Sequence, residues 1–450
     1  MRPDRNMMMQ ERRAPFAGLM ILLLAATAYG NQWRYSRVYE PVNPTSQFYT
    51  TITGLEVLQN DDFAPLKGKA VAVVTNQTGL NRQGEHILDL LDREEGVTLR
   101  VIFGTEHGLY GTAPDGEKVA DTEDTLTGVK VYSLYGQTRK PTPDQLAGVD
   151  VVIFDMQDVG ARYYTYASTM TLVMDACARD DVAFWVLDRP NPVRGDAIDG
   201  PILDRDYSSF VGMHPIPIRH GLTMGELAIM INEEGWLSDL SPTERRGRTE
   251  DRHARLTVVP LLNWSRYMWW DETGLEWVPP SPNIPTPETA LAYLGACLLE
   301  GTSISEGRGT HEPFLVCGAP WIDGRGLAEM LNRRNLPGAE FEDIVFTPKS
   351  IEGMATHPKF QDQACGGVRL KITDRETFQP IHTTAVMIHL IRENYPHQFE
   401  WSGTIDRLWG SDTFRRYIDH GRSIEAHPST YAKDRDAFYS RRKGYLIYGE

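Results

Sequence analysis

The chain has 450 residues, of which 41% are hydrophobic and 24% charged, a composition typical of a soluble globular protein with two or three domains. Its formal net charge of −15 excludes a general electrostatic attraction to nucleic acid or to anionic membranes. An anionic substrate would therefore need local arginine residues for its recognition.

The first 28 residues have the layout of a secretory signal peptide. Four arginines, at positions 2, 5, 12 and 13, precede the uncharged apolar run 16–28, which is too short to span a bilayer comfortably. The run ends in the small-x-small site Ala26-Thr27-Ala28, so we expect cleavage after Ala28, export to the periplasm or medium, and no stable membrane insertion afterwards. The alternative is an uncleaved N-terminal anchor. Because the segment carries four Arg against Asp4 and Glu11, its removal would leave a net charge of −17.

Apolar runs alternate with helical patterns from about residue 68, after a stretch over 29–50 that predicts a linker. Nearly continuous apolar strands separated by helices predict a parallel sheet covered on both faces, a Rossmann-like layout. Neither GxGxxG nor GxxxxGK[ST] is present, so we expect no nucleotide cofactor. The predicted strands are 70–75, 98–103, 129–134, 149–154 and 182–187, and the predicted helices are 84–95 and 167–179.

A second domain is predicted beyond the charge-rich stretch 245–255, which reads as a solvated connector. We expect the Rossmann-like domain to cover residues 51–252 and an α/β domain, opening with a strand over 256–262, to cover residues 253–450. The four cysteines, at positions 177, 297, 317 and 365, lie in apolar contexts that predict buried thiols or at most one disulfide. No spacing of His or Cys predicts a metal site.

The most informative motif is FGTEHG, residues 103–108, directly after a predicted strand. Gly104 and Gly108 allow a sharp backbone exit there. This places Glu106 and His107 at the carboxyl end of the strand, where open α/β sheets bind ligands. A glutamate between glycines at that point has little structural purpose, so we predict a functional role for Glu106. His107 could instead satisfy a backbone carbonyl.

Other predicted strands deliver carboxylates, amides, arginines and tyrosines to the same edge of the sheet. The aspartates could instead cap the following helices or turns, and the tyrosines could simply pack. The residues concerned are Asn76 and Gln77 after the first strand, Asp155, Gln157, Asp158, Arg162, Tyr163 and Tyr164 after the strand 149–154, and Asp188, Arg189 and Asn191 after the strand 182–187.

The second half contributes the segment SEGRGT, residues 305–310, with Glu306 and Arg308. Two glycines bracket Arg308, so it can hold a carboxylate through two hydrogen bonds, or else form an interdomain salt bridge. Asn283, flanked by prolines in SPNIP, can present its amide rigidly. The chain has neither the GxSxG nucleophile-elbow motif nor an SxxK motif with its partner motifs, and this disfavours a serine hydrolase. Carboxylates, His, Arg and amides suit glycoside hydrolysis.

Five separated motifs, in order, resemble those of the NamZ-type exo-β-N-acetylmuramidases: FGTEHG, VIFDMQDVGARYYTY, VLDRPNP, SPNIPTPETAL and EGTSISEGRGTHEPF. The resemblance runs from about residue 50 to the C-terminus. It implies a Rossmann-like N-terminal domain, a smaller C-terminal α/β domain and an active-site cleft between them. It also implies removal of N-acetylmuramic acid from the non-reducing end of peptidoglycan fragments, without a metal or nucleotide. Leu109 and Tyr110 depart from the family pattern, so substrate fit around that loop is open.

The resemblance assigns the acidic catalytic residue to Glu106, which we interpret as a general acid oriented by His107. The second catalytic group stays open among Asp155, Asp158 and Glu306, and the mechanism could be retaining, inverting or substrate-assisted. The lactyl carboxylate of the substrate needs a cation, for which Arg308 is favoured over Arg162 and Arg189. The predicted substrate-binding residues are Asn76, Gln157, Arg162, Tyr164, Asp188, Arg189, Asn191, Asn283 and Arg308.

Two other functions remain compatible with the sequence. One is a protein that binds muropeptides without cleaving them. The other is a hexosaminidase specific for N-acetylglucosamine.

Overall fold

A computed structural model describes residues 34–40, 50–106, 108–110, 122–135, 138–239 and 252–449. The predicted signal peptide, residues 1–28, and His107 lie outside the described residues. Within the described ranges, no helix has both the length and the apolar character needed to cross a membrane.

The larger domain is built on an eight-stranded sheet in the order β1-β8-β7-β6-β2-β3-β5-β4. All neighbouring strands pair in parallel except β4 with β5. The predicted Rossmann-like parallel sheet is therefore confirmed. The strands are β1 (Ser36–Val38), β2 (Lys69–Thr75), β3 (Val97–Gly104), β4 (Thr122–Glu123), β5 (Lys130–Ser133), β6 (Val151–Asp155), β7 (Ala183–Leu187) and β8 (Arg255–Val259).

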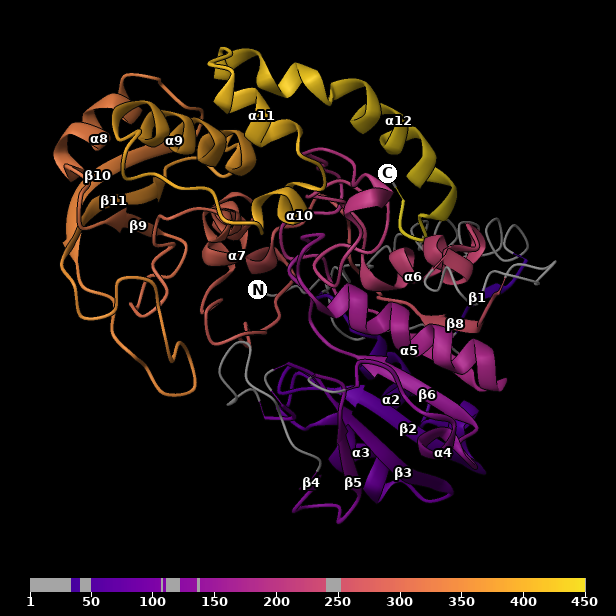
Figure 1. The fold of residues 1–450 in the computed structure, drawn as a ribbon. Helices are drawn as coiled ribbons and strands as arrows, with labels where there is room; N and C mark the ends of the chain where they lie inside the picture. The colour runs from indigo at the N-terminus through magenta and orange to yellow at the C-terminus, as the bar shows by residue number, and fades with distance from the viewer. Residues whose placement is uncertain are drawn as a thin grey trace, which may run out of the picture.

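Helices cover both faces of this sheet because its strands alternate their apolar side chains between two cores. Val71 and Val73 of β2 pack in the cluster that includes α2 and α3. Ala72 and Val74 pack in the cluster that includes α5 and α6, which lie together on the same side of the sheet (Figure 1). Because helices cover both faces of the sheet, its strands are apolar along most of their length. The helices are α2 (Gly54–Asn60), α3 (Ile87–Arg93), α4 (Pro143–Leu146), α5 (Tyr166–Asp180) and α6 (Met224–Glu233).

Two segments differ from the expected organisation. Residues 36–38, expected in a linker, form β1, which pairs with β8. The strand expected to open the second domain is β8, and it pairs with β7 inside the first sheet. The apolar residues Leu256 and Val258 are buried there against α6, which explains the placement. The position of the domain boundary itself stays a prediction.

The smaller domain has a three-stranded antiparallel sheet in the order β10-β11-β9, with helices packed on it. Its elements form one hydrophobic cluster with the α5 and α6 side of the large sheet. The expected second, smaller α/β domain is confirmed. The elements are α7 (Pro287–Ala296), β9 (Val316–Ala319), α8 (Gly324–Asn332), β10 (Ala339–Phe346), β11 (Cys365–Ile372), α9 (Pro380–Asn394), α10 (Ile405–Trp409), α11 (Thr413–Asp419) and α12 (Ala432–Arg442).

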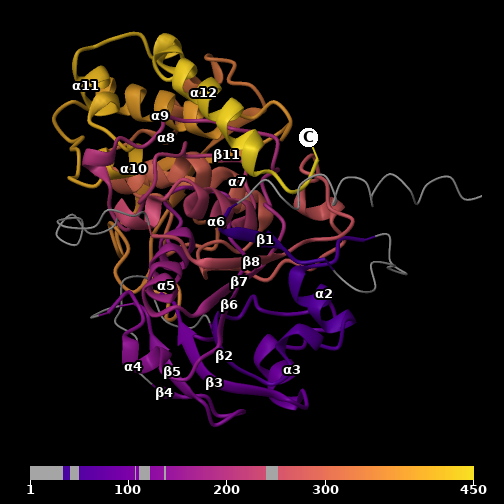
Figure 2. The ribbon, with the colours of Figure 1, turned by 90° about the vertical axis from the view of Figure 1, so that its right-hand side faces the viewer.

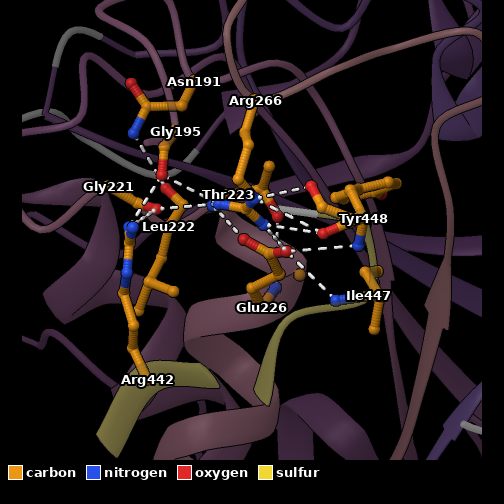
Figure 3. A network of polar contacts seen from close by, with 12 residues as sticks. Asn191, Gly195, Gly221, Leu222, Thr223, Glu226, Arg266, Arg442, Ile447 and Tyr448 are labelled. Atoms are coloured by element: carbon orange, nitrogen blue, oxygen red, sulfur yellow. Dashed lines mark hydrogen bonds and ion pairs between the residues drawn. The ribbon is translucent and has the colours of Figure 1, made fainter. Parts of the chain in front are cut away.

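The C-terminal segment returns to the larger domain. Figure 2 shows α12 running from the smaller domain toward β1 and β8. Beyond it, the backbone N–H groups of Ile447 and Tyr448 donate to Oε1 of the buried Glu226, which also pairs with Arg266 (Figure 3). The Arg442 guanidinium donates to the carbonyls of Gly195 and Gly221, at 2.7 Å each. The chain end is thus part of the interdomain core.

Candidate active site

A cavity of about 610 Å³ lies where the carboxyl ends of β3 and β6 face the smaller domain. Residues 106 and 135 and the segment 163–166 form its larger-domain side. The segments 281–284, 293–314 and 355–359 supply most of the other side. Among the predicted site residues, this cavity brings together Glu106, Tyr164, Asn283, Glu306 and Arg308.

Glu106 is half-buried at the end of β3. Its Oε2 accepts a hydrogen bond of 3.1 Å from the Thr165 hydroxyl, at the start of α5. The Tyr135 hydroxyl also bonds the carboxylate, and burial together with the Glu106 charge raises the pKa of Tyr135 well above its usual range. Within the described ranges, Glu106 forms no ion pair. Its carboxyl group is therefore held by neutral hydroxyls at the cavity surface.

Glu306 has a different environment, because two cations flank it. The Lys359 Nζ lies 3.1 Å from its Oε2 and the Arg308 Nε lies 3.6 Å from its Oε1, while the side chain is 5% exposed. Lys359 also donates to the carbonyls of Leu299 and Ile304, at 2.9 Å each. Glu306 is therefore fixed by two ion pairs at the wall of the cavity.

Glu300 is a third carboxyl group in the cavity, and it accepts a 3.0 Å hydrogen bond from Arg308 Nη2. Burial and the nearby Glu306 charge raise the pKa of Glu300 above its usual value. Burial lowers the pKa of Arg308 to about 10, against the opposing effect of Glu106. The Arg308 guanidinium also lies 5.1 Å from the Phe314 ring centroid. Arg308 is therefore the cation that links all three glutamates electrostatically.

Glycine geometry positions Glu306 and Arg308. Gly307 and Gly309 have φ of 83° and 79°, in the left-handed region that glycine favours. A Cβ at Gly307 would lie 2.4 Å from the Val316 carbonyl oxygen, and one at Gly309 would lie 2.5 Å from that of Lys349. The tight turn expected around Arg308 is present, and it points both side chains into one cavity.

Aromatic side chains from both domains form the inner wall. Tyr293 of α7 meets Tyr163, Tyr164 and Phe314 edge-on, with ring centroids 4.8 to 6.0 Å apart. The Tyr163 hydroxyl donates to the Leu294 carbonyl at 2.6 Å. These contacts fix α7 against the segment that follows β6, so the cavity is preformed at the domain interface.

The structure places the other predicted acids outside the cavity lining. Asp155 is fully buried in a two-point ion pair with Arg189, at 2.6 and 3.0 Å. Asp158 is buried beneath the loop, where its Oδ2 accepts from Gly160 N at 2.7 Å, and burial raises its pKa to about 7. Asp188 accepts hydrogen bonds from the Thr223 and Tyr448 hydroxyls. Each of these aspartates holds backbone or side chains in place.

Four predicted binding residues also have structural partners. Arg162 donates to the carbonyls of Pro201, Ile216, Leu408 and Trp409, which ties α10 to the larger domain. Asn191 accepts from Val193 N in its own loop and donates to the carbonyl of Leu222, which precedes α6. Asn76 donates to Tyr166, and Gln157 donates to the carbonyls of Asp158 and Pro190. These four residues of the motifs therefore hold the loops at the edge of the sheet together.

Sequence reasoning did not single out Tyr135, Glu300, His357 or Lys359, which line the cavity. Glu300 opens the same motif as Glu306, so that motif could have indicated it. The other three lie in segments without a recognisable pattern. No group of three His, Cys, Asp or Glu arranged for a metal ion occurs among the described residues. The four cysteines are buried and unpaired.

Comparisons with known proteins cover most of the chain. The family models described as exo-beta-N-acetylmuramidase NamZ, N-terminal and C-terminal, match residues 71–288 and 291–448. Peptidoglycan beta-N-acetylmuramidase NamZ of Bacillus subtilis (strain 168) is 41% identical over 439 residues, covering 97% of this chain and 100% of that protein. Crystal structures of two DUF1343 family proteins of Bacteroides fragilis NCTC 9343 superpose with TM-scores of 0.79 and 0.72. They are 33% and 34% identical, and each alignment covers 89% of this chain and 100% or 99% of theirs.

Proposed function

Because the chain belongs to the exo-beta-N-acetylmuramidase NamZ family, we propose that it is a glycosidase that releases N-acetylmuramic acid from the non-reducing end of peptidoglycan fragments. The resemblance predicted from the five motifs is confirmed by the two family matches. The observation that best supports this activity in the present chain is the interdomain cavity, in which Glu106 lies together with Glu300, Glu306 and Arg308.

Glu106 is the proton donor in this proposal. It is held by the hydroxyls of Thr165 and Tyr135 and stands at the cavity surface, where a glycosidic oxygen can reach it. Protonation of that oxygen lets the bond to the sugar break through an oxocarbenium-like transition state. His107, next in the chain, stays a predicted orienting residue.

Arg308 is the proposed partner of the lactyl carboxylate. Burial strengthens its interaction with an anion, since a low-dielectric site screens charges weakly. Glu306, held between Lys359 and Arg308, orients the guanidinium and is the second carboxyl group of the proposed mechanism. Whether Glu306 also activates water, or the substrate's acetamido group attacks instead, depends on the pose of the sugar.

The Glu106→Gln variant tests the acid role. Gln keeps the shape and one acceptor oxygen, but its amide cannot act as an acid, so kcat/KM on a chromogenic N-acetylmuramic acid glycoside should fall at least ~100-fold. Glu340→Gln, an exposed change on β10, is the matched control and should keep full activity. A Glu106→Gln enzyme within about tenfold of wild type would exclude the acid role.

The two competing functions have their own measurements. Calorimetric binding of a muramyl disaccharide without any released monosaccharide would favour a binding protein. Faster hydrolysis of the N-acetylglucosamine glycoside than of the N-acetylmuramic acid glycoside would favour the other hexosaminidase. Removal of single N-acetylmuramic acid units from glycan chains trimmed by an endo-acting hydrolase is the outcome that the proposal requires.

We also propose that the protein is exported. The arginine-rich start, the apolar run and Ala26-Thr27-Ala28 support this. N-terminal sequencing of the protein from the periplasm or medium should find a chain that begins at residue 29. A full-length chain in the membrane fraction would instead support the uncleaved anchor.

A further inference from the structure

The loop that joins β10 to β11, residues 347–364, belongs to the smaller domain, and part of it lines the active-site cavity. The backbone N–H of Lys349 donates to the Gly309 carbonyl at 2.8 Å. The Met354 carbonyl accepts a hydrogen bond of 2.7 Å from the side-chain amide of Asn283. The loop is therefore docked on two other segments of the cavity wall.

Lys359 makes a further contact between this loop and the cavity wall. Its Nζ donates to the carbonyls of Leu299 and Ile304, at 2.9 Å each. These carbonyls lie on either side of Glu300 in the chain. Because a lysine ammonium group has three N–H donors, two of the three are used to hold the ends of the segment 299–304 together.

The same ammonium group lies 3.1 Å from Oε2 of Glu306, a buried side chain. This oxygen accepts no hydrogen bond from the described residues, so its contact with Lys359 is an ion pair alone. The other cation, Arg308, lies farther away, with its Nε 3.6 Å from Oε1. A buried carboxyl group that loses a partner cation is left uncompensated, which favours its displacement. Lys359 therefore restrains the Glu306 side chain as well as the backbone that precedes it.

The charged groups on this side of the cavity depend on one another. Arg308 Nη2 donates to Glu300 at 3.0 Å, and the same guanidinium pairs with Glu306. A shift of the segment 299–306 would therefore move all three side chains together. Such a shift would change their distance from Glu106, which lies on the larger-domain side of the cavity.

We propose that Lys359 is a positioning residue of the glycosidase reaction, which holds the segment 299–306 and thereby places Glu300 and Glu306. Glycosidases require a defined separation between their carboxyl groups. A misplacement of about 1 Å can lower the rate ~100-fold. The inference rests on the proposed function, because it assigns Lys359 a part in that reaction. It makes the loop 347–364 an element of the active site.

Kinetics of Lys359→Met on the chromogenic N-acetylmuramic acid glycoside test this role. Methionine is a flexible side chain that carries neither the charge nor the donors. The kcat should fall at least ~10-fold, while KM stays within about threefold of the wild-type value. Lys349→Met is the matched control in the same loop, because the Lys349 side chain is 60% exposed and pairs only at the surface with Asp362. It should keep wild-type kinetics.

Chemical rescue separates the placement of a charge from general packing. Alkylation of Lys359→Cys with 2-bromoethylamine rebuilds a side chain of about lysine length that ends in an ammonium group. The Lys359 side chain is 32% exposed, so the reagent can reach a thiol there, whereas the four native cysteines are buried. Complete alkylation should restore kcat to within about threefold of wild type and leave the wild-type chain unchanged.

Hydrogen–deuterium exchange measured by mass spectrometry gives a readout that does not depend on activity. Peptides that cover residues 299–310 should exchange faster in Lys359→Met than in wild type, because the segment opens more readily without its clamp. In Lys349→Met the same peptides should exchange at the wild-type rate.

Several results would overturn the proposal: a wild-type kcat in Lys359→Met, no recovery after complete alkylation, or unchanged exchange over 299–310. A raised KM with an unchanged kcat would also overturn it, and would make Lys359 a ligand of the substrate instead. A wild-type chain that cleaves no glycoside, but whose exchange still depends on Lys359, would overturn the proposed function and leave the placement of Glu300 and Glu306 by Lys359 intact.

Discussion

Three glutamates share the active-site cavity, and their neighbours give them different chemical roles. Glu106 is held by the hydroxyls of Thr165 and Tyr135. Glu306 is held by Lys359 and Arg308, and burial raises the pKa of Glu300. Only Glu106 combines access to the cavity with the absence of an ion pair among the described residues. It is therefore the carboxyl group that a substrate in the cavity can reach without displacing a salt bridge.

Replacing Arg308 should separate substrate recognition from chemistry. Arg308→Ala removes the proposed partner of the lactyl carboxylate, and charge-assisted hydrogen bonds contribute about 1.5–3 kcal/mol. The KM for an N-acetylmuramic acid glycoside should rise by about 10- to 100-fold. Kinetics on the N-acetylglucosamine glycoside, which lacks that carboxylate, serve as the control. An equal loss on both glycosides would assign Arg308 to the general architecture of the site.

Asp158 makes a pH-dependent contribution to stability. Burial raises its pKa to about 7, whereas an unfolded aspartate titrates near 3.9. The folded chain binds the proton more tightly, so stability is fully present below about pH 4 and falls as pH rises toward 7. Asp158→Asn should remove this loss and gain stability relative to wild type with rising pH, by no more than about 4 kcal/mol.

Urea denaturation of both proteins between pH 4 and pH 8 measures this difference. Because Asp158 lies outside the cavity lining, the variant should also keep glycosidase activity within about threefold, well short of the loss expected for an acid–base residue. A stability difference that does not change with pH would show that Asp158 is ionised throughout. A ~100-fold loss of activity would instead indicate a catalytic role for Asp158.

At the scale of elements, the loop 305–310 decides the geometry of the cavity. It lies between α7 and β9, and two glycines with positive φ turn it so that Glu306 and Arg308 line the same cavity as Glu106. Phe314, with φ of 64°, continues the turn and lies under Arg308. Such a loop tolerates few side chains, because the backbone of Val316 and Lys349 approaches its glycines closely.

Gly307→Ala should impair the site more than the fold. The positive φ costs an alanine about 1–2 kcal/mol, and its Cβ would clash with the Val316 carbonyl, so the loop must shift. We expect a fall in kcat/KM of at least about tenfold, since small displacements of catalytic groups are costly. Gly403→Ala, which has open space around it, is the control. Unchanged kinetics in Gly307→Ala would show that the turn does not set the side-chain positions.

At the scale of the whole molecule, the C-terminus joins the two domains. The Tyr448 hydroxyl donates to Asp188 at the end of β7 (2.6 Å) and accepts from Leu261 N (2.8 Å). The nearby backbone N–H groups bond Glu226, and Arg442 bonds two loops of the larger domain (Figure 3). A segment far from the active-site cavity thus helps to hold the two sides of that cavity in position relative to each other.

Tyr448→Phe should lower the free energy of unfolding by about 1–3 kcal/mol, because it leaves Leu261 N without a partner in a buried place. Equilibrium urea denaturation measures the change. Tyr439→Phe is the matched control, since the Tyr439 side chain is 39% exposed. Equal stability of the two variants would mean that the hydroxyl network is not needed to hold the C-terminus.

The sequence by itself determined the parallel sheet, the second domain and the family. Continuous apolar strands and glycine-bracketed motifs are local patterns, so they can be recognised from the order of the residues alone. It also pointed to Glu106 and Arg308, which stand at strand and loop ends. Only the tertiary structure decided which polar residues share a cavity. Asp155, Arg162 and Asp188 look equally functional in the sequence, but their partners lie far along the chain and bury them. Side-chain direction and long-range pairing, which set those roles, are not encoded in local spacing.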